Sequence, residues 1–237
     1  MKSKPYVAFL NQMPVYQVDV ELLDYAGVNV PSSAVANVKN RYPTLSKLTF
    51  DKQQKLIRVN HLKATVYDAI IKRSYELMMQ YFIGVVNAVI AGGTYVQQII
   101  GSEHVEYTER EIIAAGNWNG VCRMIAERII RNLESKRDTQ QLIGAVNKRL
   151  ELGIAKKVFD EVAMYIEVRH LLVHNSGKAD QNFRAKYGKK VSIGKTGEIG
   201  INYHFVQSAL RKMHALVATY DLALINKGVI PLTHQQP

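Results

Sequence analysis

Residues 77–96 read LMMQYFIGVVNAVIAGGTYV, and no charged residue lies between Glu76 and Glu103. The stretch is long enough to cross a bilayer. However, Gln80 and Asn87 interrupt it, three glycines weaken it, and no cluster of lysine or arginine flanks its far end. We therefore interpret it as a buried helix of an all-helical bundle, and we expect no membrane association.

Further segments show apolar residues at helical spacing. This helix extends over about residues 62–91, and others are expected over 109–135 (starting at 109 or at 121), 139–150, 155–175 and 203–226. Between the last two, KVSI and EIGI flank GKTG, which is typical of a small β-hairpin. The predicted fold class is therefore all-α, a helical bundle with one small hairpin before its last helix.

The first 55 residues are the least regular part of the sequence, with prolines at positions 5, 14, 31 and 43. A short helix over 34–41 and extended pieces such as PVYQVDVELL are compatible with them. We therefore expect an N-terminal extension of open role, residues 1–55, and a helical domain, residues 56–237.

The sequence start lacks the apolar run of a secretory signal, and the single Cys122 cannot form an intramolecular disulfide. We expect a cytoplasmic protein.

The chain carries a formal net charge of +11 at pH 7, from 31 lysine and arginine residues against 20 aspartate and glutamate residues. Such an excess favours a polyanionic partner, because cationic side chains neutralise phosphates and release counterions. An anionic membrane surface would compete for the same charges.

A second stretch, EVRHLLVHNSGKAD at residues 167–180, places a cation and two imidazoles at the end of an otherwise apolar helix. At 3.6 residues per turn this helix has two apolar stripes, so it is expected to pack against its own bundle and against something else. The second stripe is a candidate subunit interface, formed by Met164, Val168, Leu171 and Leu172. Gly177 is suited to a left-handed C-cap, and the helix dipole favours positive charge beside it.

Cleavage of RNA by its own 2′-hydroxyl needs three groups. A base removes the proton from the 2′-hydroxyl, an acid protonates the leaving 5′-oxygen, and a fixed cation offsets the charge that grows on the phosphate. His174 and Arg169 can supply this chemistry without a metal or other cofactor. Five residues of helix place the two side chains about 140° apart. Either the arginine reaches around the helix, or a second protomer completes the site.

Other interpretations of these residues stay open. Arg169 can be a salt-bridge partner or can lie along apolar surface with its charged end in water. Histidine is often a hydrogen-bonded structural residue. His170 and His174 are four residues apart on one helix face and could hold a metal, although the sequence shows no third ligand.

A basic segment follows this helix. Residues 178–195 hold six basic residues and one acidic residue, Asp180. We expect a mobile loop that follows an RNA backbone, with Phe183 or Tyr187 stacking on a base. The predicted RNA-binding residues are Lys178, Arg184, Lys186, Lys189 and Lys190. A solvated loop without a ligand is the alternative, and a weaker basic patch is expected at Arg123, Arg128 and Arg131.

The segment YIEVRHLLVHNSGKAD, residues 165–180, resembles the signature of the HEPN superfamily of metal-independent RNases. Arg169 and His174 form an R-x4-H pattern, and His170 follows the arginine, where the family commonly has Asn, Asp or His. HNSGKADQNF and the hairpin KKVSIGKTGEIGIN are similar to the RiboL-PSP and MAE-type branches. The resemblance follows helix order over about residues 60–228 and reaches motif level over 165–205.

The resemblance implies an antiparallel helical bundle and a homodimer that brings two R-x4-H motifs into one cleft. It implies that Arg169 stabilises the phosphate, that His174 is the acid or base, and that His170 supports them. Family members often act as toxins, abortive-infection effectors or antiphage effectors, so RNA and a separate antitoxin chain are the expected partners. The alternatives are a non-catalytic RNA-binding or protein-interaction module, a nucleotide-handling enzyme or metal-dependent hydrolase that uses the two histidines, and a membrane-associated bundle.

Overall fold

A computed structural model of the chain describes residues 1–29, 52–93, 106–118 and 139–237, with six single positions, 98, 120, 121, 124, 125 and 128. The described residues are mostly helical, which confirms the predicted all-α class. They form two compact units, each built from distant segments of the sequence: residues 1–13, 75–167 and 211–237 make the first, and residues 14–74 and 168–210 make the second. The helix expected over 34–41 and Cys122 lie outside the described residues.

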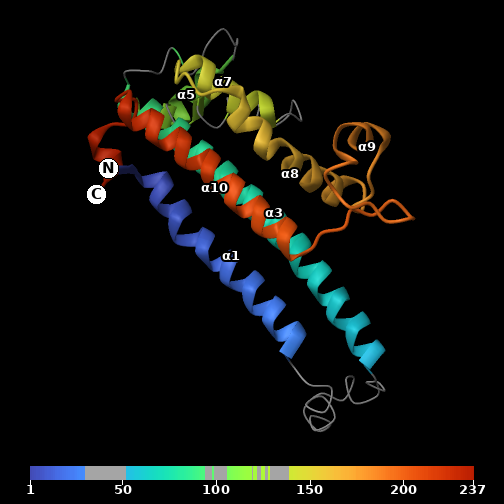
Figure 1. Cartoon of the computed structure of the whole chain (residues 1–237). Helices are drawn as coiled ribbons and strands as arrows, with labels where there is room; N and C mark the ends of the chain where they lie inside the picture. The colour runs from blue at the N-terminus through green and yellow to red at the C-terminus, as the bar shows by residue number, and fades with distance from the viewer. Residues whose placement is uncertain are drawn as a thin grey trace. The chain divides into compact units, whose positions relative to one another are not determined.

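Figure 1 shows the helices, and their bounds largely follow the apolar spacing of the sequence. The bounds of α7, α8 and α10 agree with the expected ranges to within one residue, whereas α3 begins ten residues earlier than expected. A helix is expected from residue 109. The structure has α5 there, which covers six residues, and the chain then turns at Gly116, where φ is +73°. The bounds are α1 (Lys4–Asn29), α3 (Lys52–Gly92), α5 (Glu109–Ala114), α7 (Thr139–Arg149), α8 (Lys156–His174), α9 (Gln181–Tyr187), α10 (Tyr203–Asn226) and the 3-10 helix η2 (Leu232–His234).

The N-terminal segment differs most from the prediction, because residues 4–29 form the continuous helix α1 where irregular chain was expected. Pro5 lies in the first turn, where a helix does not need the missing backbone N–H. Pro14 lies inside the helix and costs one hydrogen bond. Phe9 and Val20 are 1% and 0% exposed. Burial of apolar side chains from α1 therefore outweighs the cost of its prolines, and the expectation of extended pieces in this segment was wrong.

The two ends of the chain meet in the first unit. Strand β1 (Lys2–Ser3) pairs antiparallel with β2 (Gln235–Gln236), with Lys2 opposite Gln236. Figure 1 shows the N- and C-termini close together. These two strands form a two-stranded sheet made from the chain ends.

A buried carboxylate lies next to this sheet. Asp221 of α10 is 2% exposed and accepts hydrogen bonds from the hydroxyl of Ser3, from the backbone N–H of Ser3 at 3.2 Å and from the hydroxyl of Tyr81 at 3.5 Å. Phe82 packs edge-to-face between Tyr81 and Tyr220, with ring centroids 5.1 Å apart in each pair. Polar contacts and aromatic packing therefore join β1, α3 and α10 in the first unit.

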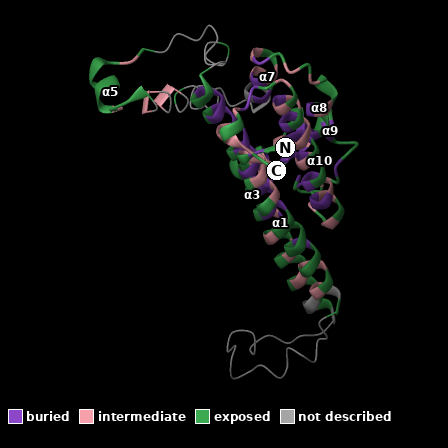
Figure 2. Ribbon diagram, turned by 90° about the vertical axis from the view of Figure 1, so that its left-hand side faces the viewer, coloured by how far each residue is buried: buried purple, intermediate pink, exposed green. Residues whose placement is uncertain are grey.

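Figure 2 colours the ribbon by burial, and buried residues recur along α3, α8 and α10. Residues 85–90 of α3 are almost entirely buried, as expected for a core helix. Among the described residues, one helix, over Leu56–Gly92, is long and apolar enough to cross a membrane, and half of its most apolar window is buried within the structure.

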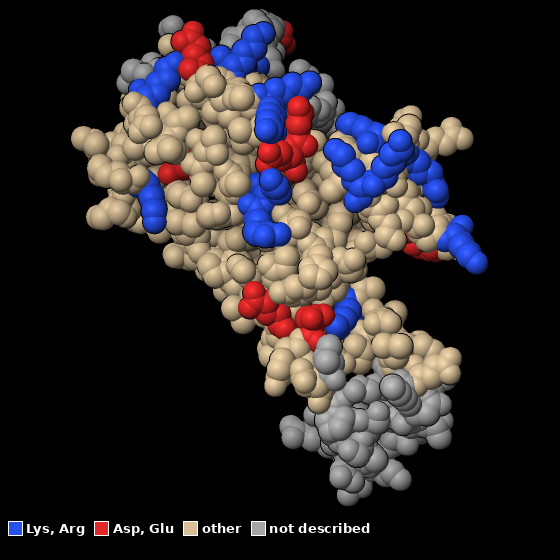
Figure 3. Space-filling view, in the orientation of Figure 1, with Lys and Arg blue, Asp and Glu red and all other residues tan. Residues whose placement is uncertain are grey.

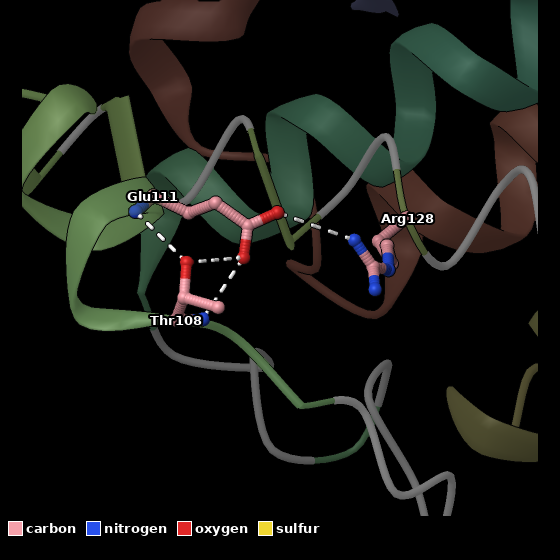
Figure 4. Close-up of polar contacts among 3 residues, drawn as sticks. All are labelled: Thr108, Glu111 and Arg128. Atoms are coloured by element: carbon pink, nitrogen blue, oxygen red, sulfur yellow. Dashed lines mark hydrogen bonds and ion pairs between the residues drawn. The ribbon is translucent and has the colours of Figure 1, made fainter.

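Helix α5 begins with a capping box (Figure 4). The backbone N–H of Glu111 donates to the Thr108 hydroxyl at 3.2 Å, and the Thr108 backbone N–H donates to the Glu111 carboxylate at 2.9 Å. The Glu111 carboxylate accepts hydrogen bonds from both the backbone N–H and the hydroxyl of Thr108, and these, together with Arg128 3.6 Å away, lower the pKa of Glu111. Arg128 also lies 5.5 Å from the ring centre of Tyr107. This arginine of the expected weaker basic patch is therefore engaged within its own unit, while Arg123 and Arg131 lie outside the described residues.

In the second unit, the end of α1 lies against the start of α3. Lys63 binds Asp24 at 2.6 Å. A Cβ atom on Gly27 would lie 2.8 Å from the Val59 side chain, so glycine allows the close approach of the two helices. Burial and the neighbouring Asp24 raise the pKa of Tyr67 to about 12.

Candidate functional site

The predicted catalytic side chains lie in the last two turns of α8, within the second unit. Val168 and Leu171 are 0% and 4% exposed and anchor this end of the helix. Between and after them, Arg169 is half-buried, whereas His170 and His174 are exposed. The apolar anchors therefore hold two imidazoles at the protein surface.

The second apolar stripe of α8 is not an open face. Val168 and Leu171 are buried, and Met164 and Leu172 are half-buried. Val173 is the exposed apolar residue at this end, at 43%. This stripe therefore packs within the protein, and the expectation that it forms a subunit interface is not supported by its burial.

The structure brings the two histidines together. The ring centres of His170 and His174 are 4.6 Å apart, with an angle of 44° between the ring planes. Arg169 is five residues before His174, about 140° around the helix axis, and is more buried than either imidazole. The histidine pair is therefore assembled on one face of α8, and the guanidinium belongs to a different face.

The chain leaves α8 through a tight left-handed turn. Ser176 and Gly177 have φ values of +50° and +74°, so Gly177 adopts the conformation expected of it. The backbone N–H groups of Asn175 and Gly177 both donate to the carbonyl of Leu171 at 2.9 Å, and the Asn175 side chain donates to the carbonyl of Lys178 at 2.7 Å. This turn redirects the chain directly after His174.

The expected hairpin is present in reduced form and holds this turn in place. Ile193 and Ile199 form an antiparallel bridge, and Lys178 and Glu198 form another. The N–H of Ala179 donates to the carbonyl of Gly197, and the N–H of Ile199 donates to that of Gly177, both at 2.9 Å. The hairpin is therefore hydrogen-bonded to the residues that follow the histidine pair.

The expected mobile loop contains a helix instead, α9. Asp180 accepts a hydrogen bond from the Phe183 N–H at 2.7 Å and caps its N-terminus. Phe183 and Tyr187 are 1% and 6% exposed. The expectation that either ring stacks on a base is therefore wrong. Their spacing of four residues is that of one helix face, and burial of this face is what orders the segment.

All five predicted RNA-binding side chains are exposed. Figure 3 shows lysine and arginine side chains gathered over α9 and the residues around it. Two of them also make contacts within the protein: Arg184 Nε donates to the carbonyl of Ala179 at 3.1 Å, and Lys186 Nζ lies 4.9 Å from the ring centre of Tyr187. Lys178 lies opposite Glu198, and the other two predicted residues are Lys189 and Lys190.

The sequence prediction missed Glu198, which the hairpin places opposite Lys178. Hydrogen bonds from the Thr196 hydroxyl and from its own backbone N–H lower the pKa of Glu198, and the charge of Lys178 lowers it further. Glu198 therefore offsets part of the positive charge of Lys178. No local sequence pattern signals this pairing, because Lys178 lies outside both arms of the hairpin and is brought to Glu198 by the fold.

Within the described ranges, no group of three or more histidine, cysteine, aspartate or glutamate side chains is arranged to hold a metal ion. The surface at the end of α8 therefore combines two adjacent imidazoles, a half-buried guanidinium and a basic helix held nearby by the hairpin. Comparisons of the chain with protein-family models, with curated proteins and with solved structures find no match.

Proposed function

We propose that this protein is a metal-independent endoribonuclease of the HEPN type that cleaves RNA by attack of a 2′-hydroxyl on the adjacent phosphate. The observation that carries the proposal is the pair of exposed imidazoles of His170 and His174, 4.6 Å apart, beside the basic surface of α9. Proton transfer by imidazole and phosphate binding by lysine are two of the functions that such a reaction requires.

In the proposed reaction, His174 carries out one of the two proton transfers, either removal of the 2′-hydroxyl proton or protonation of the leaving 5′-oxygen, and a water molecule carries out the other. The bond from phosphorus to the 2′-oxygen forms and the bond to the 5′-oxygen breaks, so the products carry a 2′,3′-cyclic phosphate and a 5′-hydroxyl. Arg169 offsets the charge on the phosphorane, and His170 supports His174. Lys189 and Lys190 hold the RNA backbone in this scheme.

The position of Arg169 favours a site shared by two protomers. The half-buried guanidinium and the exposed imidazoles lie on different faces of α8. In a two-fold dimer, the arginine of one protomer can face the histidine of the other. A homodimer with composite sites is therefore part of the proposal, and a toxin or antiphage effector restrained by a separate antitoxin chain is the biological role proposed for it.

The test is incubation of purified protein with total RNA in EDTA, with wild type beside His174→Ala. We expect wild type to release fragments with 5′-hydroxyl ends and His174→Ala to release none. His61→Ala is the matched control, because His61 is also an exposed helical histidine but lies on α3. It is expected to cleave as wild type does.

Cleavage by both wild type and His174→Ala would contradict the proposal, because the active site would then lie elsewhere. RNA binding without cleavage by any of the folded proteins would support the second candidate, a non-catalytic RNA-binding module. The exposed basic surface around α9 is the observation that favours this second candidate.

A further inference from the structure

The histidine pair has a property that RNA cleavage does not use. His170 and His174 are one helical turn apart, both are exposed, and their ring centres are 4.6 Å apart. Two imidazoles at this spacing on a helix can bind one metal ion, as in sites where a helix supplies two zinc-binding histidines four residues apart.

Two imidazoles bound to one ion must lie close together. With a metal–nitrogen bond of about 2.05 Å and about 1.15 Å from nitrogen to ring centre, a 90° angle at the metal places the ring centres about 4.5 Å apart, and a tetrahedral angle places them about 5.2 Å apart. The observed separation of 4.6 Å is therefore compatible with both rings binding one ion, in either geometry after a small side-chain rotation. Among first-row divalent ions, Cu²⁺ has the highest affinity for nitrogen ligands.

The charges around the histidine pair both favour and oppose a bound cation. The pair lies in the last two turns of α8, where the helix dipole favours a cation. Arg169 and the exposed lysines of the basic segment oppose a second positive charge nearby. We therefore expect binding that needs both imidazoles, because neither one alone would overcome this repulsion.

We propose that His170 and His174 together form a binding site for one divalent transition-metal ion, Cu²⁺ preferred, with solvent filling the remaining coordination positions. Binding is independent of the proposed function. The effect of binding on RNA cleavage rests on the proposed function. An ion on His174 occupies the nitrogen lone pair that accepts the proton, so the occupied site does not cleave RNA.

The experiment is a calorimetric titration of the untagged full chain with CuCl₂, followed by electron paramagnetic resonance of the bound ion. Wild type is expected to bind one equivalent through two nitrogen ligands, and His170→Ala and His174→Ala are each expected to lose this equivalent or bind it at least tenfold more weakly. His61→Ala is the control, because it removes an exposed helical histidine outside the pair. Unchanged copper affinity and spectrum in the double variant His170→Ala/His174→Ala would overturn the proposal.

A second measurement separates this proposal from the proposed function. RNA cleavage by wild type is followed with and without Cu²⁺, then after excess EDTA, with RNA and the ion alone as the blank. If copper binding needs both histidines but the protein never cleaves RNA, the metal site is supported and the ribonuclease proposal is refuted. If the protein cleaves RNA but its copper affinity is unchanged when both histidines are replaced, only the metal-site proposal is refuted.

Discussion

At the scale of single residues, Asp221 shows how one buried group joins distant parts of the first unit. It accepts hydrogen bonds from Ser3 near the N-terminus and from Tyr81 on α3. Burial raises the pKa of Asp221 above its usual 3.8, although the hydrogen bonds from Ser3 and Tyr81 act in the opposite direction. The loss of solvation is therefore the larger effect, and the folded protein holds this proton more tightly than the unfolded chain does.

This difference predicts a pH dependence that Asp221→Asn removes. The stability that the raised pKa of Asp221 contributes is fully present below about pH 3.8. It is lost as the pH rises through the pKa that Asp221 has in the folded protein. The loss is about 1.4 kcal/mol for each tenfold difference in proton affinity between the folded and unfolded states. We therefore expect the free energy of unfolding of wild type, minus that of Asp221→Asn, to fall between pH 4 and pH 7. Urea unfolding of both proteins across this range measures it, and a constant difference would contradict it.

A second residue-scale prediction concerns the hairpin turn. Gly197 has φ of +97°, and a Cβ atom there would lie 2.9 Å from an Arg184 guanidinium nitrogen. Gly197→Ala is therefore expected to lower the free energy of unfolding by about 1–3 kcal/mol, through backbone strain and displacement of Arg184.

Gly144→Ala is the matched control for this substitution. Gly144 is exposed within α7 and has no atom within 4 Å of a Cβ position. Alanine there is expected to raise the free energy of unfolding by about 0.5–1 kcal/mol, because it restricts the unfolded chain. Chemical denaturation of both variants measures the two changes, and equal signs would contradict the argument.

At the scale of elements, the sequence predicts α7, α8 and α10 well, because their apolar spacing and glycine stops are local signals. It does not predict α1, where the prolines at 5 and 14 indicate irregular chain and burial against distant segments decides otherwise. The same limitation applies to α9: Phe183 and Tyr187 indicate an aromatic surface in isolation, and packing turns them inward. The positions of Arg169, His170 and His174 on α8 follow from spacing alone, whereas the pairing of Lys178 with Glu198 depends on how the segment after α8 folds against the hairpin.

The basic surface of α9 and the residues after it gives an element-scale prediction. A 2′-O-methyl RNA cannot be cleaved by 2′-hydroxyl attack, so its affinity can be measured with the intact site. In the plot of log affinity against log salt, Lys189→Ser/Lys190→Ser is expected to reduce the slope by about 1.4, or about 0.7 for each phosphate that the variant no longer neutralises.

Lys156→Ser/Lys157→Ser is the control for this pair. It removes two adjacent exposed lysines from the start of α8 and changes the net charge equally. Its salt slope should equal that of wild type. An equal reduction in both variants would mean that RNA responds to net charge and not to the surface around α9.

At the scale of the whole molecule, the proposed composite site makes activity a property of two protomers. Mixing Arg169→Ala with His174→Ala tests it. Random exchange makes about half of the dimers mixed, and each mixed dimer has one site with both groups and one with neither. About a quarter of wild-type cleavage is therefore expected from two proteins that are inactive separately. An inactive mixture whose mixed dimers are shown by mass spectrometry would mean that each protomer keeps its own site.

The pairing of the chain ends has a mechanical consequence. Lys2 and Gln236 form the pair of the β1–β2 ladder that lies nearest to both termini. A force applied to the two ends therefore opens this antiparallel ladder one pair at a time, as a zip opens, and does not shear both pairs at once. The next resistance is the buried contact between Ser3 and Asp221. Under tension, the first bonds to yield join the two ends of the chain, and the helices are loaded only after them.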